Sequence, residues 1–496
     1  AAPHGGAHDA LGRPGGIMIS WNPLAGRLSS LARGARPGDI LSLTVPLPAL
    51  PGGLPATDEW FYWQRPDAGL SLVGLGAAFR IETSGGGRFG ALAAGMAGLR
   101  AAWRHDDGGS GLPARAFSGF AFAPENLPRQ GFPNACLTVP AVLLREEDGR
   151  AWATFSCAVA DMEGAPARWR RLLAEKGARL DLSAGKSSLA PFPTFPMAPF
   201  PTAPISLLRL PAPLPDLAFL ARGRAALSAI DRGELEKLVL TRSVRFRGDR
   251  DVAPGPVLAA LAARNPSCAV WAVGRGGRVF LGASPERLLA VNGAAIGADA
   301  IAGTTWVAPA GGDAPPPLSL AGGKNRREHD LVAESVAGSL APLCDGIAVP
   351  EAPEIVRLRD LQHLRRRISG RRKTGIEAFD LLARLHPTPA VGGTPTPAAM
   401  DWLAAHGDRR GAWYTGGIGW LADDGDADFA IALRCGLLSG RDIALFAGAG
   451  FVAGSDPRQE MAETEAKLSP MLSALRATPA GIRPVLASAL KRHATP

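Results

Sequence analysis

The spacing of the apolar residues constrains the fold of this chain more than any other feature of its sequence. From about residue 60 to residue 157 they occur in short runs, such as WFYWQRP, LSLVGLGAAFRI and ACLTVPAVLLRE, separated by glycine and proline. Short apolar runs with turn residues between them are typical of antiparallel strands. The pattern returns near the C-terminus, where GGIGWL, FAIALRCGLL and IALFAGAGFV predict a meander.

Helices are predicted at irregular intervals between these strands. One covers residues 88–103, a second follows the N-terminal strands, and others begin near residues 217, 256, 325, 375 and 397. Because the strands cluster and a regular alternation of strand and helix is missing, the pattern predicts an α+β fold with large antiparallel sheets.

Composition and charge exclude several classes of protein. Of the 496 residues, 46% are hydrophobic and no run reaches 18 apolar residues, so we predict a packed interior and no membrane span. The net charge is +9, but the basic residues are dispersed and aromatic residues are few, which favours steering of a small dianion over nucleic-acid binding. The five scattered cysteines form no CxxC pair, so we expect buried thiols in a reducing cytoplasm.

Composition also suggests how the chain is divided. Residues 1–20 lack the basic start and apolar core of a secretion signal, and we expect a disordered leader there. Residues 185–216 are rich in proline, which predicts a linker or a crossing segment within one fold. We therefore predict a variable α+β part at 21–184, a catalytic part at 217–476 and a C-terminal tail at 477–496.

The stretch from Leu445 to Leu468 combines a strand, a glycine-rich loop and a helix start, where Ser455 or Asp456 can act as the N-cap. Glu460, Glu463 and Lys467 follow at a spacing that places them on one helical face. Two carboxylates and an ammonium there could hold a hydrated divalent cation and an anionic substrate. The alternative is an exposed helix with ordinary intrahelical ion pairs.

Four further residues could carry chemistry. Glu328 stands near a helix start, where it either compensates the helix dipole or completes an oxygen-only site suited to magnesium. Lys237 in an apolar strand and Glu286 just after a strand would form an acid/base couple if both faced one cleft; otherwise the lysine extends to solvent. Arg434 interrupts an apolar strand and needs either a ligand carboxylate or a structural salt bridge.

These stretches match, in order and spacing, the motifs of a known family. Between residues 236 and 468 the chain resembles the chorismate-utilising enzymes, and among them the isochorismate synthases. The motifs are EKLVLTR (236–242), FLGASPERL (280–288), AIAGT (300–304), REHDLV (327–332), LQHL (361–364), LHPTPAVGGTP (385–395), YTGGIGW (414–420), ALRC (432–435) and AGAGFVAGSDPRQEMAETEAKL (447–468).

The resemblance implies large antiparallel sheets packed as a sandwich, helices outside, and an active site in a cleft between the halves. It also implies magnesium-dependent conversion of chorismate to isochorismate, in which water attacks ring carbon 2 and the hydroxyl at carbon 4 leaves. Lys237 would be the general base and Glu286 the general acid, while Glu328 and Glu463 would hold Mg²⁺ with help from Glu460. The substrate pocket would comprise Ala302, Gly303, Thr304, His363, Ala390, Tyr414, Leu433, Arg434, Gly448 and Lys467.

Two positions distinguish the related activities. Aminodeoxychorismate synthases carry lysine where Ala302 stands, and anthranilate synthases carry glutamine where Lys237 stands, so the pair found here indicates water as the nucleophile. The resemblance implies no amidotransferase subunit, a monomer, and a cytoplasmic enzyme whose product feeds siderophore or menaquinone synthesis. A salicylate synthase, which also eliminates pyruvate, and a non-catalytic chorismate-binding paralogue are the alternatives.

Overall fold

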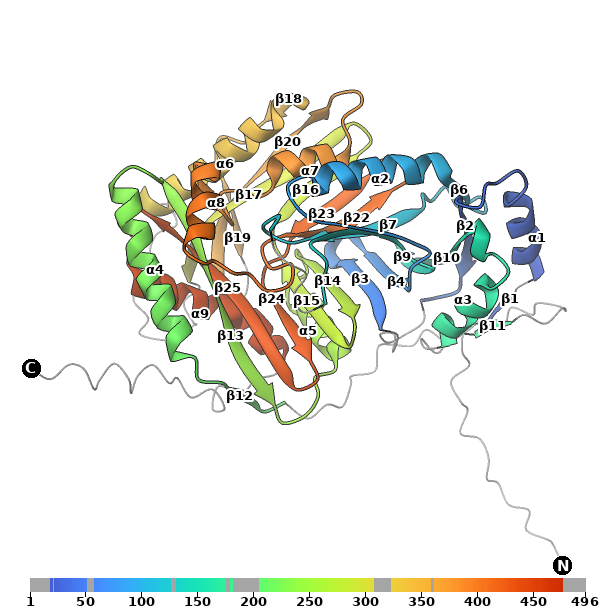
Figure 1. The fold of residues 1–496 in the computed structure, drawn as a ribbon, viewed down its shortest axis with the longest axis horizontal. Helices are drawn as coiled ribbons and strands as arrows, with labels where there is room; N and C mark the ends of the chain where they lie inside the picture. Colours follow the sequence, from blue (N-terminus) through green and yellow to red (C-terminus); the bar gives the residue numbers. More distant parts are fainter. Residues whose placement is uncertain are drawn as a thin grey trace, which may run out of the picture.

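The computed structural model describes residues 18–20, 22–50, 58–125, 131–174, 179–181, 205–306, 323–357 and 361–475. Two large sheets pack face to face, and helices lie on their outer sides (Figure 1). The predicted α+β fold is confirmed. The predicted leader up to residue 17, the proline-rich residues 185–204 and the predicted tail lie outside the described residues.

The first sheet has 13 strands and draws on both parts of the sequence. The two parts meet where β14 pairs with β3, with Val270 opposite Gln64. Its strands are β2 (Ile40–Leu47), β3 (Glu59–Arg65), β4 (Leu70–Leu75), β6 (Trp103–Asp106), β9 (Val142–Glu147), β10 (Arg150–Ala158), β12 (Leu207–Arg209), β13 (Lys237–Gly248), β14 (Ala269–Arg275), β15 (Arg278–Ser284), β21 (Gly393–Thr394), β24 (Cys435–Ser439) and β25 (Asp442–Val452).

The second sheet has 10 strands and is also shared, because β7 pairs with β22. The proline-rich stretch therefore connects two sequence parts that contribute to the same two sheets. Apart from the parallel pairs β2–β6 and β1–β11, the pairing is antiparallel among the described strands. The strands of this sheet and the small pair are β5 (Phe79–Thr83), β7 (Arg115–Phe120), β8 (Ala135–Val139), β16 (Arg287–Asn292), β17 (Ala295–Trp306), β18 (Cys344–Ala348), β19 (Glu354–Arg357), β20 (Leu361–Arg372), β22 (Gly417–Ala422), β23 (Ala427–Ile431), β1 (Met18–Ser20) and β11 (Arg179–Asp181).

The helices cover the outer faces of the two sheets. One hydrophobic cluster joins the ten-stranded sheet to α2, α6 and α7, and another joins the larger sheet to α1, α3, α5 and α9. The helices are α1 (Asn22–Leu31), α2 (Arg88–Ala102), α3 (Ala165–Ala174), α4 (Pro213–Asp231), α5 (Pro254–Arg264), α6 (Gly323–Leu340), α7 (Ala378–Leu385), α8 (Thr396–Ala405) and α9 (Pro457–Ala474), with 3-10 turns η1 (Pro66–Ala68) and η2 (Val159–Asp161).

A third cluster fills the space between the sheets and makes the sandwich. It is built from large side chains of both inner faces, including Trp63 and Trp271 from the larger sheet and Ile418 from the smaller one. One ion pair crosses this layer: Arg65 of β3 donates to both carboxylate oxygens of Asp428 in β23, at 2.9 and 2.7 Å. All five cysteines are buried and free, as the sequence predicted.

The strand β20 is longer than its sequence suggests. The residues QHLRRRISG show no regular strand pattern, and yet they belong to a 12-residue strand paired along β17. The row of arginines hides the alternation of apolar and polar residues. Glu354 of β19 compensates two of them, since it accepts from Arg365 at 2.6 Å and Arg367 at 3.0 Å.

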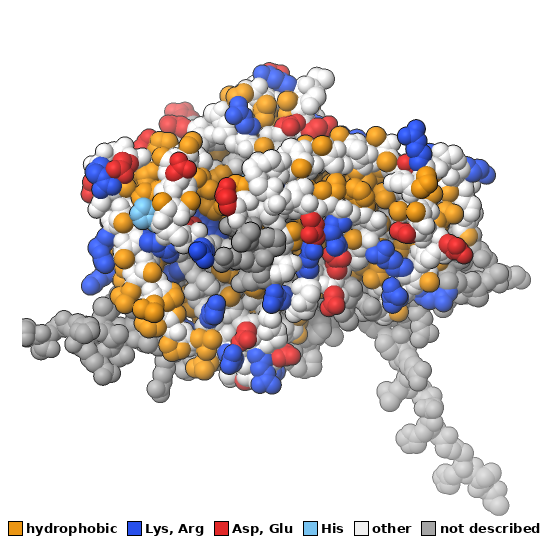
Figure 2. All heavy atoms as spheres, viewed as in Figure 1, with side chains coloured by type: hydrophobic (Ala, Val, Ile, Leu, Met, Phe, Trp, Pro, Cys, Tyr) orange, Lys and Arg blue, Asp and Glu red, His pale blue; other side chains and the backbone are white. Residues whose placement is uncertain are grey.

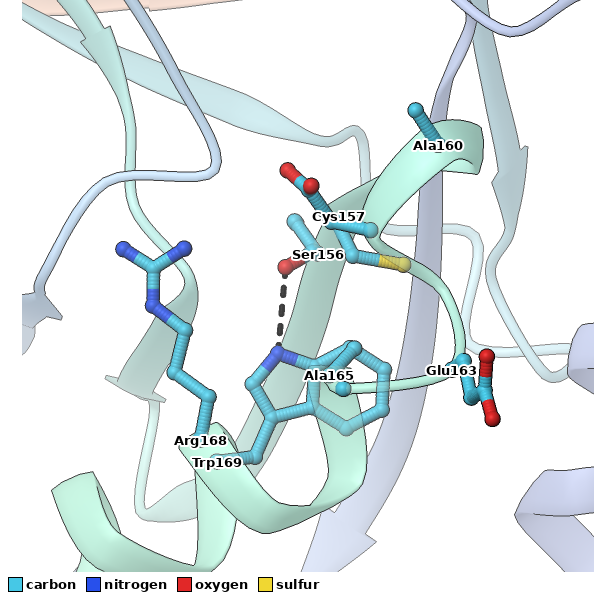
Figure 3. A pocket seen from close by; sticks show the side chains of 9 residues that line it. Ser156, Cys157, Ala160, Glu163, Ala165, Arg168 and Trp169 are labelled. Carbon is cyan, nitrogen blue, oxygen red and sulfur yellow. Dashed lines mark hydrogen bonds between the residues drawn. The ribbon is translucent and has the colours of Figure 1, made fainter.

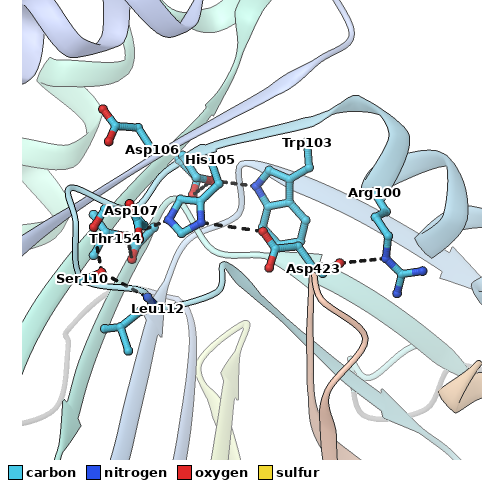
Figure 4. A network of polar contacts seen from close by, with 12 residues as sticks. Arg100, Trp103, His105, Asp106, Asp107, Ser110, Leu112, Thr154 and Asp423 are labelled. Carbon is cyan, nitrogen blue, oxygen red and sulfur yellow. Dashed lines mark hydrogen bonds and ion pairs between the residues drawn. The ribbon is translucent and has the colours of Figure 1, made fainter. Parts of the chain in front are cut away.

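A polar network joins an edge of the larger sheet to the turn between β22 and β23 (Figure 4). His105 Nε2 lies 2.9 Å from Thr44 Oγ1, and His105 Nδ1 lies 3.7 Å from Asp423 of the turn. Arg100 Nε donates to the Asp423 carbonyl at 2.9 Å. Burial lowers the pKa of His105 and raises the pKa of Asp423. The network therefore attaches one sheet to the other outside the apolar layer.

The surface mixes charged and apolar side chains (Figure 2). Hydrophobic side chains gather over α4, where Leu214 and Leu217 are exposed. Among the described helices, none is both long enough and apolar enough to span a membrane.

Candidate active site

Lys237 begins β13 and is completely buried. β13 pairs with β25 and, at this end, with β21, so the side chain is enclosed by neighbouring strands. Its Nζ lies 3.0 Å from Glu328 Oε1 of α6. The alternative in which this lysine extends to solvent is therefore wrong. At this distance the lysine and the carboxylate compensate each other for the hydration that the site removes from them.

A glycine makes room for this ion pair. A Cβ atom on Gly450 of β25 would lie 2.6 Å from Glu328 Oε1 and 3.3 Å from Lys237 Cε. Any side chain at this position would therefore displace the carboxylate or the lysine. The sequence reasoning did not single out Gly450, and its only signal is the run of small residues in AGAG.

Glu286 lies in the tight connection between β15 and β16 and is 3% exposed. Its backbone N–H donates to Ser284 Oγ at 3.3 Å, and its carbonyl accepts from Ile431 N at 3.1 Å. The pKa of the carboxyl is raised to about 8: burial and then the charge of Asp299 raise it, whereas Lys237, Arg434 and Lys467 lower it. Oε1 is buried and has no hydrogen-bond partner among the described residues, so the carboxyl keeps one oxygen available to a ligand.

Arg434 and His363 form a second buried pair. Arg434 has φ of +48°, a strained left-handed conformation for a residue with a side chain. Its Nη2 lies 2.9 Å from His363 Nε2, and His363 Nδ1 lies 3.4 Å from the Gly303 carbonyl. Because a guanidinium only donates, Nε2 accepts and Nδ1–H donates. Burial, followed by the charges of Arg434 and Lys467, holds the pKa of His363 well below its usual value, which agrees with a neutral ring.

Arg434 keeps a donor for a ligand. Its Nε is buried and has no hydrogen-bond partner within the described part of the chain. Gly303, whose carbonyl anchors His363, has φ of +74° in a bulge of β17 that follows Ala302. Thr304 pairs through its backbone with His363 across the sheet. His363 thus connects the bulge in the motif AIAGT to Arg434 through two hydrogen bonds.

The first turns of α9 complete the site. Asp456 is the N-cap and accepts from the N–H groups of Arg458 and Gln459, which decides between the two predicted caps. Lys467 Nζ lies 2.5 Å from Glu463 Oε1 and donates to the Gly448 carbonyl at 2.9 Å. Glu460 is only 2% exposed. The alternative of a solvent-exposed helix face is therefore wrong for α9.

The remaining predicted pocket residues are distributed around these groups. Tyr414 is buried and stacks on Phe446 with ring centroids 5.4 Å apart. Its hydroxyl would be 3.2 Å from a Cβ placed on Gly448, so a larger residue at 448 would press on the tyrosine. Ala390 and Leu433 are partly buried.

The carboxylates suit a hard divalent cation in kind, since magnesium prefers oxygen ligands. Glu328 and Glu463 are, however, ion-paired with Lys237 and Lys467 in this structure. Within the described residues, no three His, Cys, Asp or Glu side chains are grouped closely enough to hold a metal ion. A cation held by these carboxylates would therefore compete with the two lysines for them.

A cavity of about 640 Å³ lies elsewhere, between β10 and α3 (Figure 3). Arg168 on its wall donates to the Ala77 carbonyl at 2.7 Å, and Trp169 Nε1 donates to the Ser156 carbonyl at 3.1 Å. Burial raises the pKa of the Cys157 thiol to about 12, so this thiol is protonated and unreactive at neutral pH.

The family is shown by comparison with known proteins. A family profile described as chorismate binding enzyme matches residues 41–476. The chain therefore belongs to the chorismate-binding enzymes. It is 32% identical over 442 residues to the salicylate biosynthesis isochorismate synthase of Pseudomonas aeruginosa, with 84% of each chain covered.

Other relatives carry related names. The isochorismate synthase MenF of Bacillus subtilis is 34% identical over 252 residues, covering 50% of this chain and 54% of the relative. Among solved structures, the menaquinone-specific isochorismate synthase MenF of Escherichia coli is similar with a TM-score of 0.68 and 26% identity, covering 91% of this chain and 99% of that one. The structural match shows that this chain has the fold of the Escherichia coli enzyme.

The sequence reasoning missed residues that surround the predicted ones. Asp299 acts on Glu286, and its only signal was an acid in the apolar strand ADAIAG. His329, next to Glu328, is fully buried, and neither ring nitrogen has a hydrogen-bond partner among the described residues. Burial lowers the pKa of His329 to about 4, so the ring is neutral.

Proposed function

We propose that this protein is an isochorismate synthase that converts chorismate to isochorismate with Mg²⁺. The observation that carries the proposal is a buried lysine beside a carboxylate, within electrostatic reach of a second carboxyl group with a strongly raised pKa. Two such groups of opposite character are what an addition of water coupled to loss of a hydroxyl needs. Ala302 leaves space for a small nucleophile.

Lys237 acts as general base and Glu286 as general acid. The amine takes a proton from the water that bonds to ring carbon 2, and the ammonium that forms is stabilised by Glu328, 3.0 Å away. Glu286 gives its proton to the hydroxyl at carbon 4, which leaves as water. A carboxyl with a pKa of about 8 holds this proton at neutral pH. We expect turnover to decline as pH rises through that value, since the acid then loses its proton.

The cations of the site bind the two substrate carboxylates. Arg434 offers its free Nε, and neutral His363 holds the guanidinium in place without competing for the anion. Lys467 and the backbone at Gly448 support the same carboxylate. Glu328, Glu463 and Glu460 would hold Mg²⁺, which when bound supplies positive charge that neutralises the ring carboxylate.

We further propose a cytoplasmic monomer that works without an amidotransferase subunit, because a lysine base serves water and no ammonia is required. Relatives named for menaquinone and for salicylate synthesis support a product used for quinones or siderophores.

Incubation with chorismate tests the proposal. Purified protein with Mg²⁺ should form isochorismate, resolved by chromatography, and addition of EDTA should stop it. Lys237→Ala should abolish conversion, whereas the exposed Lys373, which donates to the Pro342 carbonyl, provides a control in Lys373→Ala. Salicylate and pyruvate as the main early products would identify a salicylate synthase instead. Absence of any magnesium-dependent product would identify a non-catalytic paralogue.

A further inference from the structure

Asp299 lies behind the proposed general acid. β16 and β17 pair from Asn292 to Ala290 and then diverge, and β16 is irregular between Arg287 and Leu289 where it pairs with β23. The N–H of Arg287, the residue after Glu286, donates to Asp299 Oδ2 at 3.1 Å. The aspartate therefore binds the backbone next to Glu286, at the point where β16 and β17 are no longer paired.

The other groups on this turn are already engaged. The Arg287 side chain donates to Asp428 at 3.1 Å, and Asp428 also accepts from Arg65. The Asp299 carboxylate thus accepts from a backbone N–H, while the nearby guanidinium groups of Arg287 and Arg65 are paired with Asp428. A carboxylate that is not directly paired with a cation acts more strongly on the charged groups around it.

Glu286 is one of the groups on which the charge of Asp299 acts. The charged groups that act on it are Asp299 from β17, Lys237 from β13, Arg434 before β24 and Lys467 from α9. The three cations favour the ionised carboxyl, and Asp299 is the anion that opposes them. Burial raises the pKa of Asp299 itself, while the backbone hydrogen bond from Arg287 and the charges of Arg365, Arg287 and Arg65 act in the opposite direction and favour its ionised form.

We propose that Asp299 is a positioning residue for Glu286: its carboxylate holds the backbone directly after the acid, and its charge adds to the effect of burial in keeping Glu286 protonated until the departing hydroxyl accepts the proton. This inference rests on the proposed function, because it presumes that Glu286 is the acid. It assigns a role to a residue outside the substrate pocket.

Asp299→Asn separates the two parts of this role. The amide oxygen can still accept from Arg287 N–H, but the charge is gone. We expect the alkaline limb of the kcat profile to move to lower pH by about one unit, with kcat at the acidic plateau nearly unchanged. Asp299→Glu keeps the charge and moves the acceptor, so it should lower kcat without moving the limb. Asp428→Asn, which weakens the adjoining network, should lower thermal stability and leave the limb in place.

A second measurement does not depend on turnover. Infrared spectra of protein with ¹³C-labelled glutamate, taken as the difference from Glu286→Gln, follow the titration of the Glu286 carboxyl directly. That titration should shift downwards in Asp299→Asn without substrate present. Superimposable titrations and pH profiles for wild type and Asp299→Asn would overturn the inference. If Glu286→Gln retained the alkaline limb, the assignment of Glu286 as the acid would fail instead, and the two failures are therefore distinct.

Discussion

At the scale of single residues, the site depends on contacts that leave almost no space. Glu328 Oε1, Lys237 and the strand β25 meet where only a glycine fits, because a Cβ on Gly450 would be 2.6 Å from the carboxylate. The carboxylate is the end of a flexible side chain and can move. A substitution at this position should therefore disturb the chemistry more than the fold.

Gly450→Ala tests this expectation. The added methyl group should displace Glu328 from Lys237 and lower kcat by about tenfold to a hundredfold, since small displacements of reacting groups carry costs of that order. Steady-state kinetics and thermal unfolding should be measured together. Gly297→Ala in β17 is the matched control, because its Cβ would meet only the Ile368 carbonyl at 3.9 Å. Equal kinetics for the two variants would contradict the steric argument.

His386 provides a residue-scale prediction about stability. Burial lowers its pKa to about 3, and its Nε2–H donates to the Phe122 carbonyl at 3.1 Å. A histidine with a pKa lowered from 6.5 stabilises the fold above that value, and the stability is lost as pH falls toward the folded pKa. Between pH 7 and pH 5 the loss from this residue should be about 2 kcal/mol.

His386→Gln should remove that pH dependence, since the amide can still donate to the carbonyl but does not titrate. Urea unfolding at pH 7 and pH 5 gives the free energy of unfolding at each pH. The difference between the two values should be smaller in His386→Gln than in wild type. His329 and His363 also have lowered pKa values and remain in both proteins, so part of the acid sensitivity should persist. An unchanged difference would contradict the lowered pKa of His386 in the folded protein.

At the scale of elements, α2 shows how one helix combines exposed and packed glycines. Gly98 is exposed and a Cβ there would meet nothing within 4 Å, whereas a Cβ on Gly95 would lie 2.2 Å from Ile81 Cδ1 of β5. The two positions have the same backbone conformation and differ only in their neighbours.

Gly98→Ala should stabilise the protein by about 0.5–1 kcal/mol, because alanine loses less backbone entropy in a helix. Gly95→Ala gains the same term but forces Ile81 to move, at a cost of about 1–3 kcal/mol, and should be destabilising. Chemical denaturation of both variants gives the comparison. If both substitutions stabilised the protein, Ile81 of β5 would be able to move aside without loss of stability.

At the scale of the whole molecule, the two sheets are held by an apolar layer and by a few polar bridges. Arg65 and Asp428 join the central strands at 2.7 Å, with both side chains nearly buried. The His105 and Asp423 network joins an edge strand to the turn of the other sheet. These bridges add polar contacts between the two sheets to the apolar layer that separates them.

Asp428→Ala should destabilise the protein by about 3–5 kcal/mol, since it leaves Arg65 buried without its acceptor. The double change Arg65→Met with Asp428→Leu should recover most of this loss, because it removes both charges from the interior. Denaturant unfolding of the single and double variants measures the coupling. Equal stability of the two would show that the charge left behind finds another partner.

Local patterns in the sequence carried much of this description. The apolar runs between turn residues predicted the antiparallel strands, and α2 (Arg88–Ala102) lies within one residue of the helix predicted at 88–103. The acid before Pro457 predicted a cap, and the ordered motifs from 236 to 468 indicated the chemistry of Lys237 and Glu286. The strands, the helices and the cap depend on neighbours within a turn or two along the chain, and such neighbours are visible in sequence, whereas the roles of Lys237 and Glu286 are implied by the resemblance.

Only the tertiary structure decided which distant residues meet. That Lys237 pairs with Glu328, that Gly450 makes room for both, and that Asp299 lies behind Glu286 follow from how β13, β25, β17 and α6 pack. The same holds for the sharing of both sheets by the two sequence parts, and for the length of β20. Pairing between distant strands and burial of a charge depend on the partner that the fold supplies, and no local propensity encodes that partner.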